Sequence, residues 1–226
     1  MTAPGQVRLR VTPVFDAVDE AGRPYFSPDR WRVLDGAERA RLVGYLSGAP
    51  VAVRAYGLEP DPLDPSRGPA VPIGYRTDGV WVWQEAAEYY LGRLGVAPED
   101  EFLAHIQESR YVPPSRLPED LLLAAADAAV APSPPPAPDR RRDLRYFANV
   151  TGGRSTTAPG GVLRFWRETA PSGHDVRLAQ ACGRTLRWHD TTAPLSNTYD
   201  SEHDLVEISP RQAAAVIDRW WAAEHS

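Results

Sequence analysis

Apolar and polar residues alternate at the start of the chain with a period of two. Val7, Leu9 and Val11 are apolar, and the residues between them are polar. Successive side chains of a strand point to opposite faces, so this alternation predicts a half-buried strand. In the rest of the first half, β-branched and aromatic runs predict strands over 51–56, 71–76 and 80–83, and apolar stripes predict helices over 37–47, 85–94 and 118–130 and a further helix that begins at Pro98.

The C-terminal part of the chain predicts several strands followed by one helix. The strands are expected over 144–150, 162–168, 176–181, 185–189 and 205–208. Ser209, Pro210 and Gln212 then match the signature of a helix N-terminus, with a capping side chain, an early proline and a glutamine three residues after the cap. Val216 and Trp220 belong to the apolar stripe of this final helix. We therefore expect a small antiparallel sheet with one helix packed on a face.

A proline-rich stretch lies between these two parts. Residues 131–138 contain five prolines, and 139–142 are one Asp and three Arg. Such a composition favours an extended, semi-rigid spacer. We expect an α+β protein of two small modules, 1–130 and 143–226, joined by a linker over 131–142; a surface loop inside a single domain is the alternative. A second proline-rich stretch, 59–69, is expected to be an exposed loop.

Composition and charge exclude several classes of protein. The 25 basic residues are all Arg, so catalysis through a lysine Schiff base and a Gly-Lys-Ser/Thr phosphate loop are both excluded. The net charge is −5, and the first 130 residues carry 13 Arg against 19 acids, so no nucleic-acid partner is expected. There is one cysteine, Cys182, and neither a long apolar run nor a signal-like start. We expect a cytoplasmic protein that does not associate with membranes.

The densest aromatic cluster is the hairpin over 74–91. A strand leads to an Asp-Gly turn, a second strand carries two tryptophans, and a helix carries two adjacent tyrosines. Because the second strand is apolar on both faces, it is expected to be a central strand covered on both sides. The alternative is an exposed aromatic face, since Trp, Tyr and Arg dominate binding hot spots. The candidate binding residues are Arg76, Asp78, Trp81, Trp83 and Tyr89.

Three His-Asp dipeptides begin at His174, His189 and His203 and could supply metal ligands, but their spacings of 15 and 14 residues match no compact metal motif. Hydrogen-bonded loop ends are favoured, and neither a metal nor a cofactor is expected. His105 is expected to be satisfied by its own helix.

The sequence also contains two arrangements that could supply a nucleophile. Cys182 with His189 downstream could form a nucleophile–base pair, although a single cysteine is more often buried as a small apolar side chain. Arg154, the Ser/Thr run 155–157 and Glu207 together resemble an ADP-ribosyltransferase site, but the spacing is unspecific. No catalytic residue is assigned.

Three stretches carry a resemblance to other proteins. Tyr75–Trp83 with Tyr89–Leu91, Leu144–Val150 and Gly160–Glu168 resemble uncharacterised two-module proteins of high-GC Gram-positive bacteria. The resemblance implies no activity, and no residue role is carried over from it.

We expect a non-catalytic protein that binds another protein near the aromatic hairpin. The acidic balance favours a basic partner, and small acidic proteins of this kind include immunity or accessory proteins that neutralise a toxin by occlusion, an analogy from size and charge alone. The alternative is an enzyme that acts on a small nucleotide-like or natural-product substrate in a cleft between the modules. The sequence does not give the oligomeric state.

Overall fold

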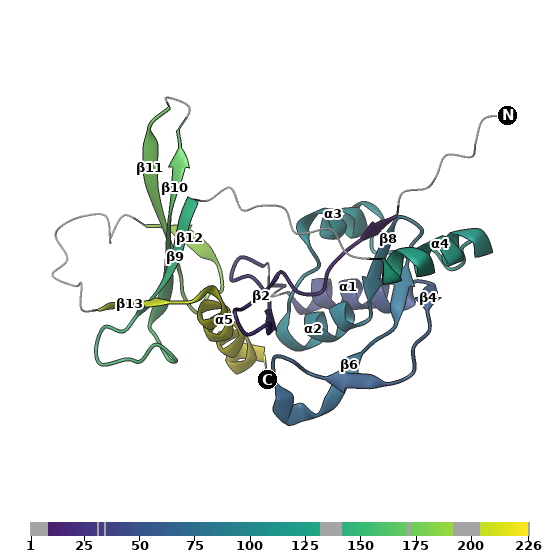
Figure 1. Cartoon of the computed structure of the whole chain (residues 1–226), viewed down its shortest axis with the longest axis horizontal. Coiled ribbons are helices and arrows are strands. Elements are labelled where there is room, and N and C mark those ends of the chain that lie inside the picture. Colours follow the sequence, from purple (N-terminus) through teal and green to yellow (C-terminus); the bar gives the residue numbers. More distant parts are fainter. Residues whose placement is uncertain are drawn as a thin grey trace. The chain divides into compact units, whose positions relative to one another are not determined.

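The computed structural model describes residues 9–30, 32–33, 35–131, 142–170, 173–191 and 204–225 (Figure 1). The chain divides into two compact units. The first unit comprises Met1–Pro24 and Arg30–Pro135, and the second comprises Tyr25–Asp29 and Pro136–Ser226. Helices and strands are mixed in an α+β fold, as predicted. Residues 132–141, which contain nearly all of the predicted linker, lie outside the described part of the chain.

The first unit is built on a four-stranded sheet. The strand order is β1 (Arg10–Val11), β8 (Trp81–Gln84), β7 (Tyr75–Thr77) and β4 (Val51–Val53). β1 runs parallel to β8, and the other neighbouring strands are antiparallel. The aromatic strand β8 therefore has a hydrogen-bonded strand on each side, which makes it central.

Both faces of β8 are covered. On one face, Trp81 and Trp83 pack in a core with residues from α1 (Gly36–Gly48), α2 (Ala86–Leu94) and α3 (Asp100–Glu108). On the other face, Val82 packs against Ala125 and Ala129 of α4 (Glu119–Val130). A strand buried in this way is apolar on both sides, which explains the two-sided pattern in the sequence.

Local sequence signals account for several helix ends in this unit. Asp35 caps α1, because its carboxylate accepts the backbone N–H of Ala37 at 2.8 Å. Gly95 ends α2 in the left-handed region, with φ of 63°, and its N–H donates to the carbonyl of Leu91. Both helices lie close to their predicted ranges.

The proline-rich stretch 59–69 is more ordered than a loop. β5 (Leu58–Pro60) pairs with β6 (Pro69–Pro72), and a short 3₁₀ helix, η1 (Pro65–Arg67), lies between them. We call β5, η1 and β6 the ribbon; β6 marks it along the lower edge of the first unit in Figure 1. Only Val51–Val53 of the predicted strand 51–56 forms a strand, and Gly57, whose φ is 133°, lies between its end and the start of the ribbon at Leu58. A separate small hairpin pairs β2 (Ala17–Val18) with β3 (Pro24–Tyr25).

The second unit contains a five-stranded antiparallel sheet followed by a C-terminal helix, as predicted. The strand order is β12 (Trp188–Asp190), β11 (Asp175–Cys182), β10 (Gly161–Thr169), β9 (Arg142–Asn149) and β13 (Leu205–Ile208). The helix α5 (Pro210–His225) follows β13. Ser209 and Gln212 form the predicted capping box, in which each backbone N–H donates to the other residue's side chain.

A short N-terminal segment, Tyr25–Asp29, belongs to the second unit rather than to the first. The indole Nε1 of Trp188 donates to the carbonyl of Pro28 at 3.0 Å, and Arg164 forms an ion pair with Asp29. The Arg164 guanidinium also lies 4.2 Å from the centre of the Trp188 ring, and its burial lowers its pKa to about 10. The second unit is therefore assembled from two distant stretches of sequence.

Candidate functional site

Asp78 organises the turn of the aromatic hairpin. Its Oδ1 accepts the backbone N–H groups of Val80 and Trp81 at 2.8 and 2.7 Å. Its Oδ2 accepts the hydroxyl of Tyr45 at 2.7 Å and lies 2.9 Å from Nε2 of His105. Burial and this hydrogen bond raise the pKa of Tyr45. The described contacts thus use all the acceptor capacity of this buried carboxylate inside the fold.

His105 differs from its expected role. It was predicted to be satisfied by its own helix α3, yet it contacts the carboxylate of Asp78 in the hairpin turn. Because an ionised carboxylate can only accept, Nε2 of His105 carries the proton and donates it. The pair joins α3 to the turn.

Trp81 and Trp83 lie in the core, with exposed fractions of 3% and 0%. Their rings lie 5.1 and 5.0 Å from the ring of Phe102, and Trp83 also stacks with Tyr45 at 6.2 Å. The alternative of an exposed aromatic face is therefore wrong for these two residues. Trp83 and Tyr45 are covered because α1, α2 and α3 pack on this side of the sheet.

Arg76 lies opposite Trp83 in the register of β7 and β8, and its guanidinium is held from two sides. Its Nε lies 3.0 Å from Oε1 of Glu85, and its Nη1 donates to the carbonyl of Ala49 at 2.7 Å. Glu88 lies near this pair: burial, with repulsion from Glu85, raises its pKa, and Arg76 opposes the shift. Arg76 thus holds β7 to the residue that precedes α2 and to the residue that follows α1.

Tyr89, the last candidate, leads to a polar cluster that the sequence did not predict. Its hydroxyl donates to Oδ2 of the fully buried Asp61 at 3.0 Å. Tyr90 donates to Oδ1 of the same carboxylate at 3.0 Å, and Arg93 donates to Oδ2 at 2.6 Å. Arg93 also reaches Asp64 at 2.8 Å. Burial raises the pKa of both tyrosines. Tyr89, Tyr90 and Arg93 share α2, whereas Asp61 and Asp64 lie within the ribbon, so this cluster fixes the ribbon to the helix.

The fixed ribbon displays apolar side chains. Tyr56, just before β5, is 87% exposed, and Leu58 is 52% exposed. All three residues of β5 are exposed. An exposed aromatic side chain, Tyr56, thus lies just before the ribbon, next to the exposed strand that begins at Leu58.

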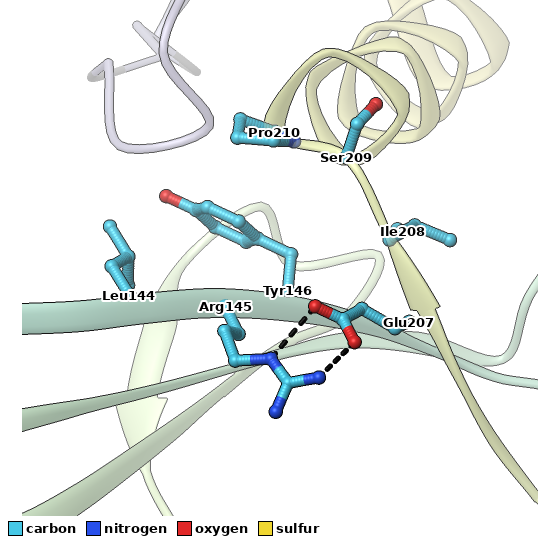
Figure 2. A pocket seen from close by; sticks show the side chains of 7 residues that line it. All are labelled: Leu144, Arg145, Tyr146, Glu207, Ile208, Ser209 and Pro210. Atoms are coloured by element: carbon cyan, nitrogen blue, oxygen red, sulfur yellow. Dashed lines mark hydrogen bonds and ion pairs between the residues drawn. The ribbon is translucent and has the colours of Figure 1, made fainter.

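The second unit has a small pocket, shown in Figure 2. Its volume is about 240 Å³, and the ring of Tyr146 projects from β9 towards Pro210 at the start of α5. On one side Arg145 and Glu207 form an ion pair, in which Nε donates to Oε1 at 2.8 Å, and this hydrogen bond lowers the pKa of Glu207. The lining residues are Leu144, Arg145, Tyr146, Glu207, Ile208, Ser209 and Pro210.

The nucleophile hypotheses do not fit the sheet. His189 pairs with Ala181, and Trp188 pairs with Cys182. Since neighbouring residues of a strand face opposite ways, Cys182 and His189 lie on opposite faces of the sheet and cannot form a nucleophile–base pair. Cys182 is also buried, as favoured.

The residues that resemble an ADP-ribosyltransferase site also make local contacts of their own. Ser155 and Thr157 hydrogen-bond to each other at 2.9 Å, in the turn closed by the N–H of Ala158 on Ser155. Glu207 is paired with Arg145. These residues form local structure rather than one site.

The aspartates of the two His-Asp dipeptides that the structure describes form hydrogen bonds between strands of the sheet. Asp175 accepts the hydroxyl of Thr169 at 3.2 Å, and Asp190 accepts the side-chain amide of Gln180 at 2.8 Å. His203 lies outside the described residues. In the described part of the chain, no three His, Cys, Asp or Glu side chains gather as a metal site would require.

Among the helices that the structure describes, none combines the length and apolar character needed to cross a bilayer. Comparison of the chain with protein-family models, curated proteins and solved structures gives no match.

Proposed function

We propose that this chain is a non-catalytic protein that binds another protein through the ribbon of its first unit. The observation that carries the proposal is the exposure of Leu58 on the ribbon and of Tyr56 just before it, beside the buried carboxylate of Asp61 that fixes the ribbon to α2. Tyrosine is enriched in binding hot spots because it supplies a large contact area with few rotatable bonds.

The anchoring cluster supports this role energetically. Binding costs conformational entropy when a loop must become ordered, and a loop that is already fixed avoids much of that cost. Asp61 receives three side-chain donors from α2 and the backbone N–H of Leu63 at 2.9 Å. The ribbon is therefore held in one shape before a partner arrives.

The acidic balance favours a basic partner. The net charge of the chain is −5, and complementary charge speeds association and excludes wrong partners. In this proposal the protein acts in the cytoplasm as an accessory or immunity-type protein, and it works by covering the partner's functional surface.

The test is a comparison of ribbon variants in affinity capture from the native host, followed by titration of the captured partner. Replacing both Tyr56 and Leu58 by Ala should weaken the affinity by about 100-fold, the usual loss for a hot spot. The matched control is Val18→Ala, another exposed apolar side chain of the first unit, which should leave the affinity unchanged. Equal affinity of the ribbon variant and the control would exclude the ribbon as the binding site.

A further inference from the structure

The helix α4 has two different sides. Ala125 and Ala129 face the sheet and are buried. On the outer side Leu123 is 62% exposed and Val130 is 76% exposed. A helix that only covered a sheet would be expected to present polar residues outward. The outer side of α4 is instead partly apolar.

The exposed residues follow a regular spacing. Asp120, Leu123, Asp127 and Val130 are all exposed and are separated by three, four and three residues. Residues at these intervals form one stripe along a helix, and alternating steps of three and four produce the seam by which one helix packs against another. We call these four residues the α4 seam; it is about 15 Å long, at 1.5 Å per residue.

The charge of the helix selects the kind of partner. Within Glu119–Val130 there are three acids, Glu119, Asp120 and Asp127, and no basic residue. The nearest preceding basic residue is Arg116, three residues before the helix. Two copies of this chain paired in parallel through the seam would place Asp against Asp, which is unfavourable. A partner with Lys or Arg at the positions opposite the aspartates would instead be attracted.

We propose that the α4 seam is a docking surface for a basic amphipathic helix of another protein, with Leu123 and Val130 as apolar anchors and Asp120 and Asp127 as partners for its cations. This surface is separate from the ribbon, and the proposal does not depend on the role of Tyr56.

The probe is a synthetic helical peptide with Leu and Lys alternating along its seam, and its control is the same peptide with Glu in place of Lys. Binding to the full-length protein is measured by fluorescence anisotropy at low and at high salt. The Lys peptide should bind and weaken as salt rises, because exposed charges are screened. The Glu peptide should not bind.

Substitutions then locate the site. Leu123→Gln combined with Val130→Gln should abolish binding of the Lys peptide, and Asp120→Asn combined with Asp127→Asn should weaken it by about tenfold or more. The matched control, Glu20→Gln with Glu108→Gln, removes the same charge from other exposed positions of the first unit. Circular dichroism melts verify that each variant is folded.

Two results would overturn the proposal. One is a Lys peptide whose affinity responds equally to the aspartate pair and to the control pair, since that would mean attraction to net charge alone. The other is self-association of the unmodified protein in sedimentation equilibrium that is lost in the Leu123→Gln variant, since the seam would then serve a second copy.

Discussion

His105 donates from Nε2 to Oδ2 of Asp78 across 2.9 Å, although 27 residues separate them. The same oxygen accepts the hydroxyl of Tyr45. Three elements, α1, α3 and the hairpin turn, therefore meet at one carboxylate. The turn that begins the aromatic strand is held in place by side chains from the helices that cover it.

Replacement of Asp78 by Asn should destabilise the first unit. The amide retains the shape and one acceptor oxygen, but its NH₂ group cannot accept, so either the two turn N–H groups or Tyr45 and His105 lose their acceptor. We expect the free energy of unfolding in urea to fall by about 2–3 kcal/mol, the cost of leaving buried donors without acceptors. Asp127→Asn, on the outer side of α4, is the control and should change it by less than about 0.5 kcal/mol. Equal stability of the two variants would contradict the role of the buried Asp78 carboxylate as an acceptor for these donors.

Substitutions of Trp83 should show that its side chain contributes to the core. Trp83→Ala removes a fully buried side chain and should lower the free energy of unfolding by about 3–5 kcal/mol. Trp83→Phe should cost clearly less, partly because the indole Nε1 has no hydrogen-bond partner among the described residues. Urea unfolding followed by circular dichroism measures both. An alanine variant as stable as the unmodified protein would show that the indole is not part of the core.

The carboxyl of Glu88 should make the free energy of unfolding depend on pH. Its pKa is raised in the folded protein, chiefly by burial, so the folded state holds its proton more tightly than the unfolded state. The stability contributed by this group is therefore present below the ordinary glutamate pKa and is lost as the pH rises through the raised value. Glu88→Gln should be more stable than the unmodified protein at neutral pH, and this difference should vanish at pH of about 3.

Urea unfolding of both proteins at a series of pH values checks this expectation. Glu20→Gln, at an exposed position of the same unit, serves as the control. A Glu88→Gln variant less stable than the unmodified protein at neutral pH would mean that the ionised carboxylate is stabilising beside Arg76.

Local patterns in the sequence predicted the elements well. The two-sided apolar character of 80–83 indicated a central strand, Gly95 indicated the end of α2, and Ser209 with Gln212 indicated the start of α5. Each signal lies within a few residues of the structure that it specifies. Periodicity and capping are local, so a single sequence can reveal them.

The polar clusters could not be predicted in the same way. Asp61 meets Tyr89, Tyr90 and Arg93 across 28 to 32 residues, and nothing in the spacing of the proline-rich stretch indicates that its first aspartate is buried. The two-sided apolar pattern of the hairpin predicted the burial of Trp81 and Trp83 correctly, but it did not predict which helices cover them. Burial depends on which helices pack on the sheet, and that is decided by long-range contacts.

The position of Tyr25–Asp29 has a consequence for how the chain is made and folded. Phe26 is buried, and the hydrogen bond from Trp188 to Pro28, within the second unit, joins residues 160 positions apart. During synthesis Pro28 leaves the ribosome long before Trp188, so this hydrogen bond can form only after β12 has been made. Contacts of such long sequence separation also slow folding, because a large loop must close first. We therefore expect the second unit to reach its native state last. Until then, a newly made chain should need protection from aggregation.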